Sequence, residues 1–178
     1  KDDMLKNKRW AALFSHTGSE IVNISNIIGR DPDVIITNNT PGSERIHEGI
    51  RDNVYVQQKP SVEDYRNVLK DVDIVTLHGW MRIIPPKICR EYKIYNLHPG
   101  LITLYPELKG ADPQKRVANT RDEKYKRVGC VIHEVISEVD AGEVLAEIST
   151  SNNFYGEDDL SCRLHEMATQ LWIQLLKT

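Results

Sequence analysis

Short apolar runs alternate with helical patterns through the first half of the chain, and this alternation constrains its fold more than any other feature. The runs cover residues 10–14, 33–37, 73–77 and 94–97, and each ends in polar or turn-forming residues. Between the first two runs, Ile21, Ile24 and Ile28 recur at helical spacing. Strands that alternate with helices predict parallel βαβ units. We therefore expect an α/β, Rossmann-like fold whose mostly parallel sheet is flanked by helices.

The second half of the chain has a different pattern. Residues 128–135 and 143–150 have the character of two strands joined by a long turn, which predicts an antiparallel hairpin in the C-terminal half. The other elements expected are a weak strand at 53–57, helices at 43–50, from 61, from 85 to 92 and at 112–120, and a closing amphipathic helix at 158–176. A length of 178 residues fits a single domain, 1–178, in which residues 1–8 form a flexible tail.

The composition excludes several classes of protein. A formal net charge of -3 lacks the basic footprint of a general nucleic-acid binder. Three cysteines, none of them in a CxxC motif, argue against a disulfide framework or a zinc knuckle and favour a reducing, cytoplasmic compartment. No apolar stretch approaches the roughly 20 residues that span a bilayer. The charged first residues are unlike a signal peptide, so no membrane partner is expected.

Three polar clusters follow the expected strands at the point where each strand ends. They cover residues 15–19, 78–82 and 96–100. Ligands of an open parallel sheet bind beyond the carboxyl ends of its strands. We therefore expect these segments to converge on one crevice.

The best candidates for chemistry are Asn96, His98 and Asp140. Asn96 and His98 are two residues apart at a strand end, so their side chains point to the same side. An amide beside an imidazole can hold a carbonyl oxygen and stabilise negative charge on it. The alternative for this pair is a capped strand end, and the alternative for Asp140, in the hairpin turn, is a residue that only caps the turn.

Other polar residues have weaker signals. Gly18, Ser19 and Glu20 follow a strand and open a helix, where backbone N–H groups can bind an anion, or where the acid simply satisfies the helix dipole. His133 lies on an expected strand and has a structural histidine as its alternative role. The remaining histidines show no metal-ligand spacing, so no metal is expected.

In order along the chain, these segments resemble the folate-dependent formyltransferase family, with a pattern closest to its phosphoribosylglycinamide branch. The family has a GSN-type turn, a GFMRIL-like segment, an NIHPSLLP motif, and a GxxxH strand that precedes a DxGxxI-type turn. This chain has Gly18-Ser19-Glu20, Gly79-Trp80-Met81-Arg82-Ile83-Ile84, Asn96-Leu97-His98-Pro99-Gly100, Gly129 to His133, and Asp140-Ala141-Gly142-Glu143-Val144.

The resemblance implies a reduced folate, 10-formyltetrahydrofolate, as co-substrate and no metal. Its pterin would lie against Met81, Arg82, Ile83 and Ile84 and against Val139 and Ala141 of the hairpin turn. By the same resemblance, Asn96 and protonated His98 would hold the formyl oxygen during attack by an amine. Asp140 would orient His98 and assist proton transfer, with His133 supporting the turn from behind. The acceptor would be bound at the turn of Gly18, Ser19 and Glu20, and Lys109, on a loop that departs from the family, is expected to contact it as well.

The chain departs from the family on the acceptor side. Glu20 replaces the Asn of the phosphate-binding turn, Gly100 replaces a Ser, and the loop 105–114 is longer than its counterpart. Glu20 would repel a phosphate, and Lys109, Lys115 and Arg116 would offer a shifted anion site. We therefore expect formyl transfer to a small-molecule amine other than phosphoribosylglycinamide: a nucleotide, a modified base or an amino sugar. A hydrolase that releases formate and a non-catalytic folate- or nucleotide-binding module are the alternatives, and the expected state is a monomer or homodimer.

Overall fold

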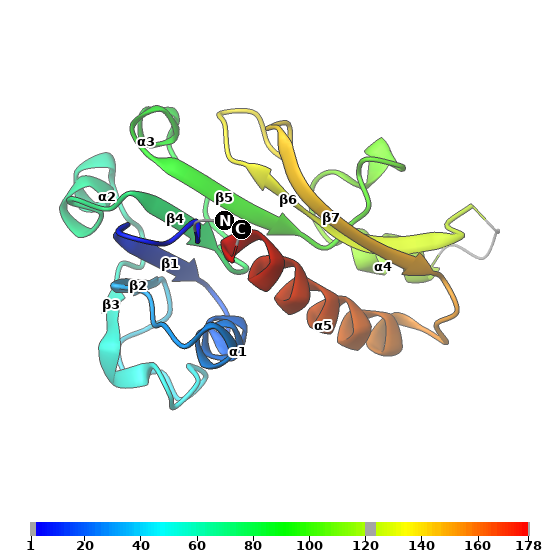
Figure 1. Ribbon diagram of the computed structural model, residues 1–178, viewed down its shortest axis with the longest axis horizontal. Coiled ribbons are helices and arrows are strands. Elements are labelled where there is room, and N and C mark those ends of the chain that lie inside the picture. The colour runs from blue at the N-terminus through cyan, green and yellow to red at the C-terminus, as the bar shows by residue number, and fades with distance from the viewer. Residues whose placement is uncertain (1–2, 120–123, 178) are drawn as a thin grey trace.

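The computed structural model describes residues 3–119 and 124–177, and within them seven strands form one sheet (Figure 1). The strands are β1 (Trp10–Phe14), β2 (Val34–Thr37), β3 (Val54–Val56), β4 (Ile74–Leu77), β5 (Lys93–His98), β6 (Arg127–Glu134) and β7 (Val144–Ser151), in the order β3-β2-β1-β4-β5-β6-β7. The first five strands pair in parallel, whereas β6 and β7 pair antiparallel. The expected mostly parallel sheet with a C-terminal antiparallel hairpin is confirmed.

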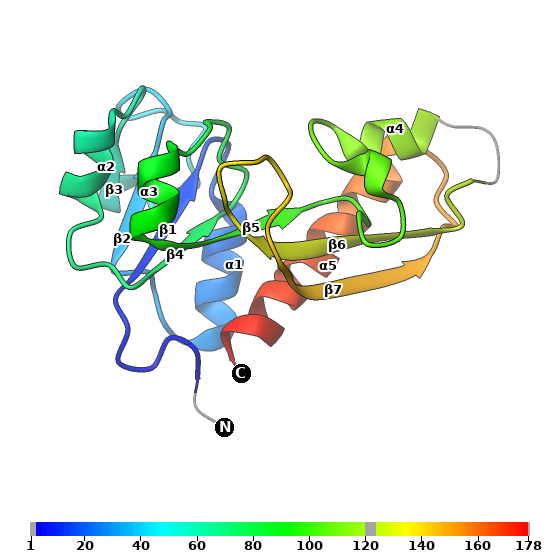
Figure 2. The ribbon, with the colours of Figure 1, turned by 90° about the horizontal axis from the view of Figure 1, so that it is seen from above.

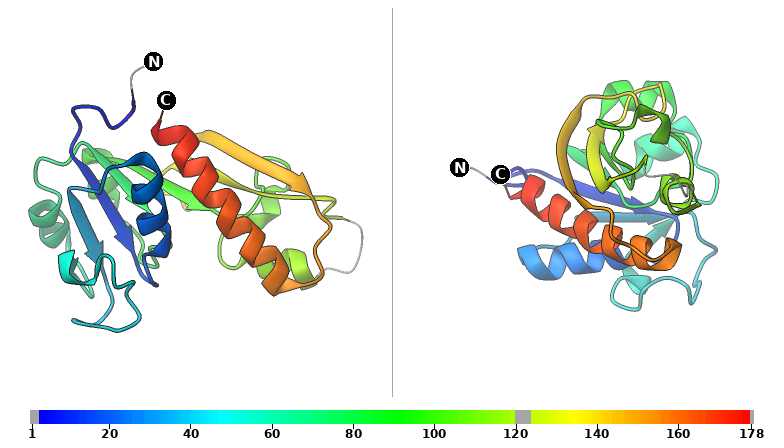
Figure 3. Two further views of the ribbon diagram at one scale, coloured as in Figure 1. Left: turned by 60° about the horizontal axis from the view of Figure 1, so that its bottom comes forward. Right: turned by 90° about the vertical axis from the view of Figure 1, so that its right-hand side faces the viewer.

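Helices cover both faces of the sheet. They are α1 (Ser19–Ile28), α2 (Val62–Val68), α3 (Pro86–Glu91), α4 (Pro113–Asn119) and α5 (Glu157–Leu176), with 3-10 turns η1 (Arg51–Asn53) and η2 (Pro106–Leu108). Figures 2 and 3 show α1 and α5 on one face and α2 and α3 on the other. The turn between β6 and β7 lies on the side of the sheet opposite α5 (Figure 2), whereas α4 packs against α5. None of the helices described is long and apolar enough to cross a membrane.

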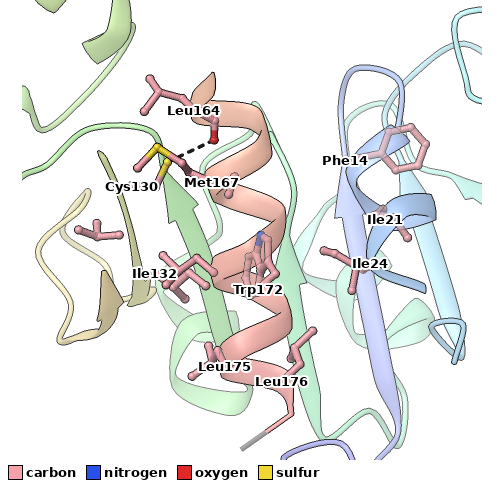
Figure 4. Close-up of a cluster of buried hydrophobic side chains, with 14 of the residues drawn as sticks. Phe14, Ile21, Ile24, Cys130, Ile132, Leu164, Met167, Trp172, Leu175 and Leu176 are labelled. Carbon is pink, nitrogen blue, oxygen red and sulfur yellow. Dashed lines mark hydrogen bonds between the residues drawn. The ribbon is translucent and has the colours of Figure 1, made fainter. Parts of the chain in front are cut away.

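The core follows from the alternation of side chains along β1. Trp10 and Phe14 belong to the apolar cluster that α1 and α5 cover, whereas Ala11 and Leu13 belong to the cluster beneath α2 and α3. Both faces of β1 are therefore buried, which explains its continuous apolar run. The expected stripe of α5 is buried throughout, namely Leu160, Leu164, Met167, Leu171 and Leu175. Figure 4 shows part of this helix packed against Cys130 and Ile132 of β6.

Two local expectations were wrong. Residues 43–50 form successive turns instead of a helix, because their backbone bonds close over three residues, as from Ile46 N–H to the carbonyl of Ser43. The guanidinium of Arg51 donates to the carbonyl oxygens of Glu44 and Ile46 and holds this loop. Residues 3–8 do not form a flexible tail, because the side chain of Leu5 is only 1% exposed. Residues 1–2 of the expected tail and residue 120 of the expected helix at 112–120 lie outside the described residues.

The three polar clusters converge as expected because β1, β4 and β5 are neighbours in the sheet. Leu77 pairs with Leu13 on one side and with Asn96 on the other. Beyond the strand ends, the N–H of Met81 donates to the hydroxyl of Ser15 at 2.7 Å. Residues from distant parts of the sequence are thus placed at one edge of the sheet.

Candidate active site

A cleft of about 470 Å³ opens at this edge of the sheet. The three polar clusters line its floor, and the start of α4 and the first turns of α5 complete its walls. Its lining includes Gly18, Ser19, Glu20, Met81, Asn96 and His98, all expected as site residues. It also includes His16 and His78, to which the sequence assigned no role.

Asn96 and His98 occupy the end of β5, next to the antiparallel strand β6. In the register of these strands, Asn96 faces His133. The side-chain amide nitrogen of Asn96 lies 3.3 Å from Nε2 of His133. His98 and His133 are both buried, and of the two only His98 lines the cleft.

Asp140 reaches this site from the turn between β6 and β7 and lies between two imidazoles. Its Oδ1 is 3.2 Å from Nε2 of His133, and its Oδ2 is 3.5 Å from Nδ1 of His98. The N–H of Gly110 also donates to Oδ2, at 2.7 Å. The expected residues Asn96, His98, Asp140 and His133 are therefore brought together by three separate segments.

The conformation of this turn depends on two residues. Asp140 has a φ of 55°, in the left-handed region that few residues other than Gly, Asn and Asp adopt. A Cβ added at Gly142 would lie 1.7 Å from the carbonyl oxygen of Glu134, so only glycine fits there. The backbone of the Asp-Ala-Gly sequence therefore needs a residue that tolerates a positive φ at its first position and a glycine at its third.

Electrostatics favour an ionised Asp140 beside a neutral His98. Burial opposes ionisation of Asp140, but the hydrogen bond from His133, the amide of Gly110 and the attraction of both imidazoles together hold its pKa below the ordinary value. Burial lowers the pKa of His98, and this outweighs the opposite effects of Asp140 and of the Leu108 carbonyl. The ligand-free protein therefore holds a carboxylate and an uncharged imidazole side by side at neutral pH.

The long loop after β5 contacts the catalytic candidates directly, which the sequence did not predict. The carbonyl oxygen of Leu108 lies 2.8 Å from Nε2 of His98. A carbonyl can only accept, so Nε2 carries the hydrogen in this tautomer. The guanidinium of Arg116 donates to the carbonyl oxygens of Glu107, Leu108 and Lys109 and holds the loop in place. The one sign of this contact in the sequence was Leu108, an apolar residue in a mostly polar loop.

Gly100 is packed against the same imidazole. A Cβ added at Gly100 would lie 2.8 Å from Cβ of Pro113 and 3.1 Å from Nε2 of His98. The glycine found where the family has a serine therefore gives His98 and the start of α4 the room that they occupy here.

Of the four residues expected to bind an acceptor, three line the cleft and one does not. Gly18 caps α1 with a φ of 75°, and Ser19 begins the helix at the wall of the cleft. Glu20 is only 9% exposed and turns toward His78, whose Nδ1 is 2.8 Å from its Oε1. Lys109 is exposed and is not among the residues that line the cleft.

The segment expected to hold a pterin is largely exposed. Met81 lines the cleft and is 66% exposed, while Ile83 is 79% exposed and Val139 is 58% exposed. Arg82 is also exposed, and Ala141 is half-buried. Ile84, in contrast, is 5% exposed and packs in the core beneath α2 and α3. Exposed apolar side chains thus flank the site on two segments, and Ile84 anchors one of them.

Comparison with known proteins places this chain in one family. The model of the formyl transferase family matches residues 17–176, and the chain belongs to that family. A phosphoribosylglycinamide formyltransferase of Dictyostelium discoideum is 42% identical over 82 residues, which are 42% of this chain and 38% of that protein. A methionyl-tRNA formyltransferase of Thermotoga maritima is 31% identical over 125 residues, which are 68% of this chain and 37% of that protein. The chain thus spans well under half the length of these two relatives.

Solved structures have the same architecture. A phosphoribosylglycinamide formyltransferase of Anaplasma phagocytophilum superposes with a TM-score of 0.81 at 26% identity, over 94% of this chain and 84% of that one. A formyltetrahydrofolate deformylase of Pseudomonas putida shares the fold, with a TM-score of 0.72 at 18% identity, over 96% of this chain and 64% of that one. Among the described residues, no group of His, Cys, Asp and Glu side chains has the arrangement of a metal site.

Proposed function

We propose that this domain transfers a formyl group from 10-formyltetrahydrofolate to the amine of a small molecule other than phosphoribosylglycinamide. The observation that carries the proposal is the position of His98, which is hydrogen-bonded through Nε2 and faces Asp140 through Nδ1. The side chain of Asn96 lies on the same side of β5, and both residues line the cleft. This arrangement suits acyl transfer, where an oxygen gains negative charge and an amine loses a proton.

Different residues would stabilise the formyl oxygen and transfer the proton. The N–H groups of His98 Nε2 and of the Asn96 amide would donate to the formyl oxygen as charge develops on it. The amine nitrogen forms a bond to the formyl carbon, and the bond from that carbon to the folate nitrogen breaks. The proton that the amine loses would pass to the ionised Asp140 and His98 pair and from there to the departing nitrogen.

A reduced folate fits the apolar side chains next to this pair. Met81, Ile83 and Val139 are apolar and mostly exposed, so they offer a flat ring an apolar surface on which to pack. They lie on the segments after β4 and before Asp140, so a pterin between them would be adjacent to the catalytic candidates. In this proposal the folate supplies the formyl group, and the protein orients it and provides hydrogen-bond donors.

The experiment that tests the proposal is an assay of formyl transfer with purified protein, 10-formyltetrahydrofolate and a panel of nucleotide, modified-base and amino-sugar amines. Production of tetrahydrofolate that depends on one amine, with stoichiometric formylation of that amine, would support a transferase. Formate released at the same rate without any amine would show a hydrolase instead. No turnover under any condition, together with no binding of a folate analogue, would refute the proposal.

A further inference from the structure

A chain of buried hydrogen bonds runs from the core to the acceptor side of the cleft. Nε1 of Trp10 donates to Oγ1 of Thr76 at 2.8 Å, and the same oxygen lies 2.7 Å from Nε2 of His78. Nδ1 of His78 lies 2.8 Å from Oε1 of Glu20. None of these four residues is more than 9% exposed. The formyl-transfer chemistry proposed above makes no use of these hydrogen bonds.

The direction of the hydrogen bonds follows from the chemistry of the four groups. An indole N–H can only donate, so Thr76 accepts from Trp10 and has its own hydrogen left to donate. Donation to Nε2 of His78 places the ring hydrogen on Nδ1, where Glu20 accepts it. Every step is then satisfied, and the carboxylate of Glu20 is held in one orientation as the final acceptor.

The second carboxylate oxygen of Glu20 is left for a ligand. Glu20 lines the same cleft as Asn96 and His98, and no described residue donates a hydrogen bond to its Oε2. Gln114, in α4, lines this cleft too, and its side-chain oxygen is buried without a hydrogen-bond partner in the described structure. Two acceptor oxygens to which no described residue donates thus belong to residues that line the space in which an acceptor molecule would lie.

The charges around the cleft also favour an acceptor group that is not an anion. Glu20 and Asp112 are acidic, and none of the described residues that line the cleft is Lys or Arg. The guanidinium of Arg45 reaches Nδ1 of His16, at 2.7 Å, but Arg45 is exposed and does not itself line the cleft. A phosphate at the start of α1 would face the carboxylate of Glu20, which repels it. A hydroxyl or ammonium group would satisfy that carboxylate.

We propose that Glu20, held in place by His78, is the acceptor-recognition residue and takes a hydroxyl or ammonium group of a polyhydroxylated amine of the amino-sugar class. The acceptor has no phosphate at the start of α1. This inference rests on the proposed formyl transfer and specifies its substrate class. Glu20 contacts the acceptor, whereas His78 acts only by positioning Glu20.

The test measures binding instead of turnover, so that it does not depend on the transfer reaction. Isothermal titration of the protein saturated with a 5-deazafolate analogue would compare glucosamine, glucosamine 6-phosphate and inorganic phosphate. We expect the wild type to bind glucosamine at least about 10-fold more tightly than its 6-phosphate and to bind no inorganic phosphate. Glu20→Gln should weaken glucosamine binding by about 10-fold or more, because a hydrogen bond to a charged group is lost, and should gain phosphate binding.

Two further variants separate recognition from structural damage. Glu63→Gln removes an exposed acid from the first turn of α2, away from the cleft, and should keep the wild-type preference. His78→Ala should weaken glucosamine binding without admitting phosphate, because the carboxylate of Glu20 remains. The inference is overturned if the wild type binds neither sugar, if it binds the 6-phosphate at least as tightly, or if Glu20→Gln leaves the preference unchanged. Intact binding preferences without any formyl transfer would refute the proposed function alone.

Discussion

His98 and Leu108 are joined by a hydrogen bond of 2.8 Å between the Nε2 of the imidazole and the carbonyl oxygen. The bond fixes the tautomer of the ring and places its N–H at the inner end of the cleft. It also occupies the atom that would hold a formyl oxygen, so a bound substrate must compete with Leu108 for this hydrogen. The loop 105–112 is therefore part of the catalytic apparatus that we propose.

Replacing His98 with Ala should lower kcat by about 10²–10³, because a preorganised donor to the formyl oxygen is lost. Binding of a folate analogue should change little, since the apolar residues that flank the site remain. Steady-state kinetics and analogue titration would separate the two effects. His47, which is exposed and does not line the cleft, provides the control, and His47→Asn should retain both the wild-type kcat and folate-analogue binding. Near wild-type turnover by His98→Ala would show that this residue is not catalytic.

Asp140→Asn should abolish most turnover while preserving the fold. Asn tolerates the left-handed backbone of this position, with its φ of 55°, but cannot take up a proton from the attacking amine. Asp140→Ala should lose turnover as well and should also be less stable than Asp140→Asn, by about 1–2 kcal/mol of backbone strain. Urea denaturation would measure the difference. Equal stability of these two variants would indicate that the turn relaxes.

The free energy of unfolding should fall as the pH is lowered below about 6.5. The folded protein lowers the pKa of His98 from its ordinary value of 6.5, so the unfolded chain binds more protons in the range just below it. One such group contributes a slope of at most about 1.4 kcal/mol per pH unit. The pKa of Asp140 is also lowered, so the free energy of unfolding falls further as the pH drops below 3.8, the ordinary value for this carboxyl. Denaturation of the wild type and of His98→Asn across pH 4.5–7.5 should show a shallower slope in the variant, and equal slopes would contradict the assignment.

Arg116→Met should release the loop that contacts His98. The guanidinium donates to three carbonyl oxygens, including that of Leu108, and hydrogen bonds to charged groups each contribute about 1.5–3 kcal/mol. We expect lower thermal stability and a reduced kcat, with folate-analogue affinity retained. Arg163→Met, which removes an arginine paired with Glu166 on the surface of α5, is the matched control. If the two variants have the same kcat, the loop does not position His98.

Ile83→Asp should remove the rise in melting temperature that a 5-deazafolate analogue produces. Ile83 is 79% exposed, so the change costs the free protein little, but it would place a charge against an apolar ring. Ile27, which is 62% exposed on α1, offers a control of the same chemistry outside the cleft. Ile27→Asp should keep the full shift. An unchanged shift in Ile83→Asp would remove this segment from the proposed folate site.

The sequence by itself determined most of the helices and strands and the candidates for chemistry. Strand β1 has the predicted limits because a continuous apolar run of only five residues, closed by turn-forming residues, favours a strand buried on both faces. The polar residues after β1, β4 and β5 indicated where a ligand would bind, since parallel strands place their carboxyl ends at one edge of the sheet. The grouping of Asn96 and His98 with Asp140 was implied by the resemblance of these motifs, in their order along the chain, to the formyltransferase family.

Only the tertiary structure decided which residues meet across the sheet. Glu20 and His78 are 2.8 Å apart because α1 follows β1 and lies beside the end of β4, and no local pattern encodes that distance. The contact of Leu108 with His98 likewise depends on the path of an irregular loop, which is set by bonds to Arg116 and not by helix or strand periodicity. Periodic patterns reveal which face of an element is buried. The partners of a buried polar group are fixed only when the elements pack together.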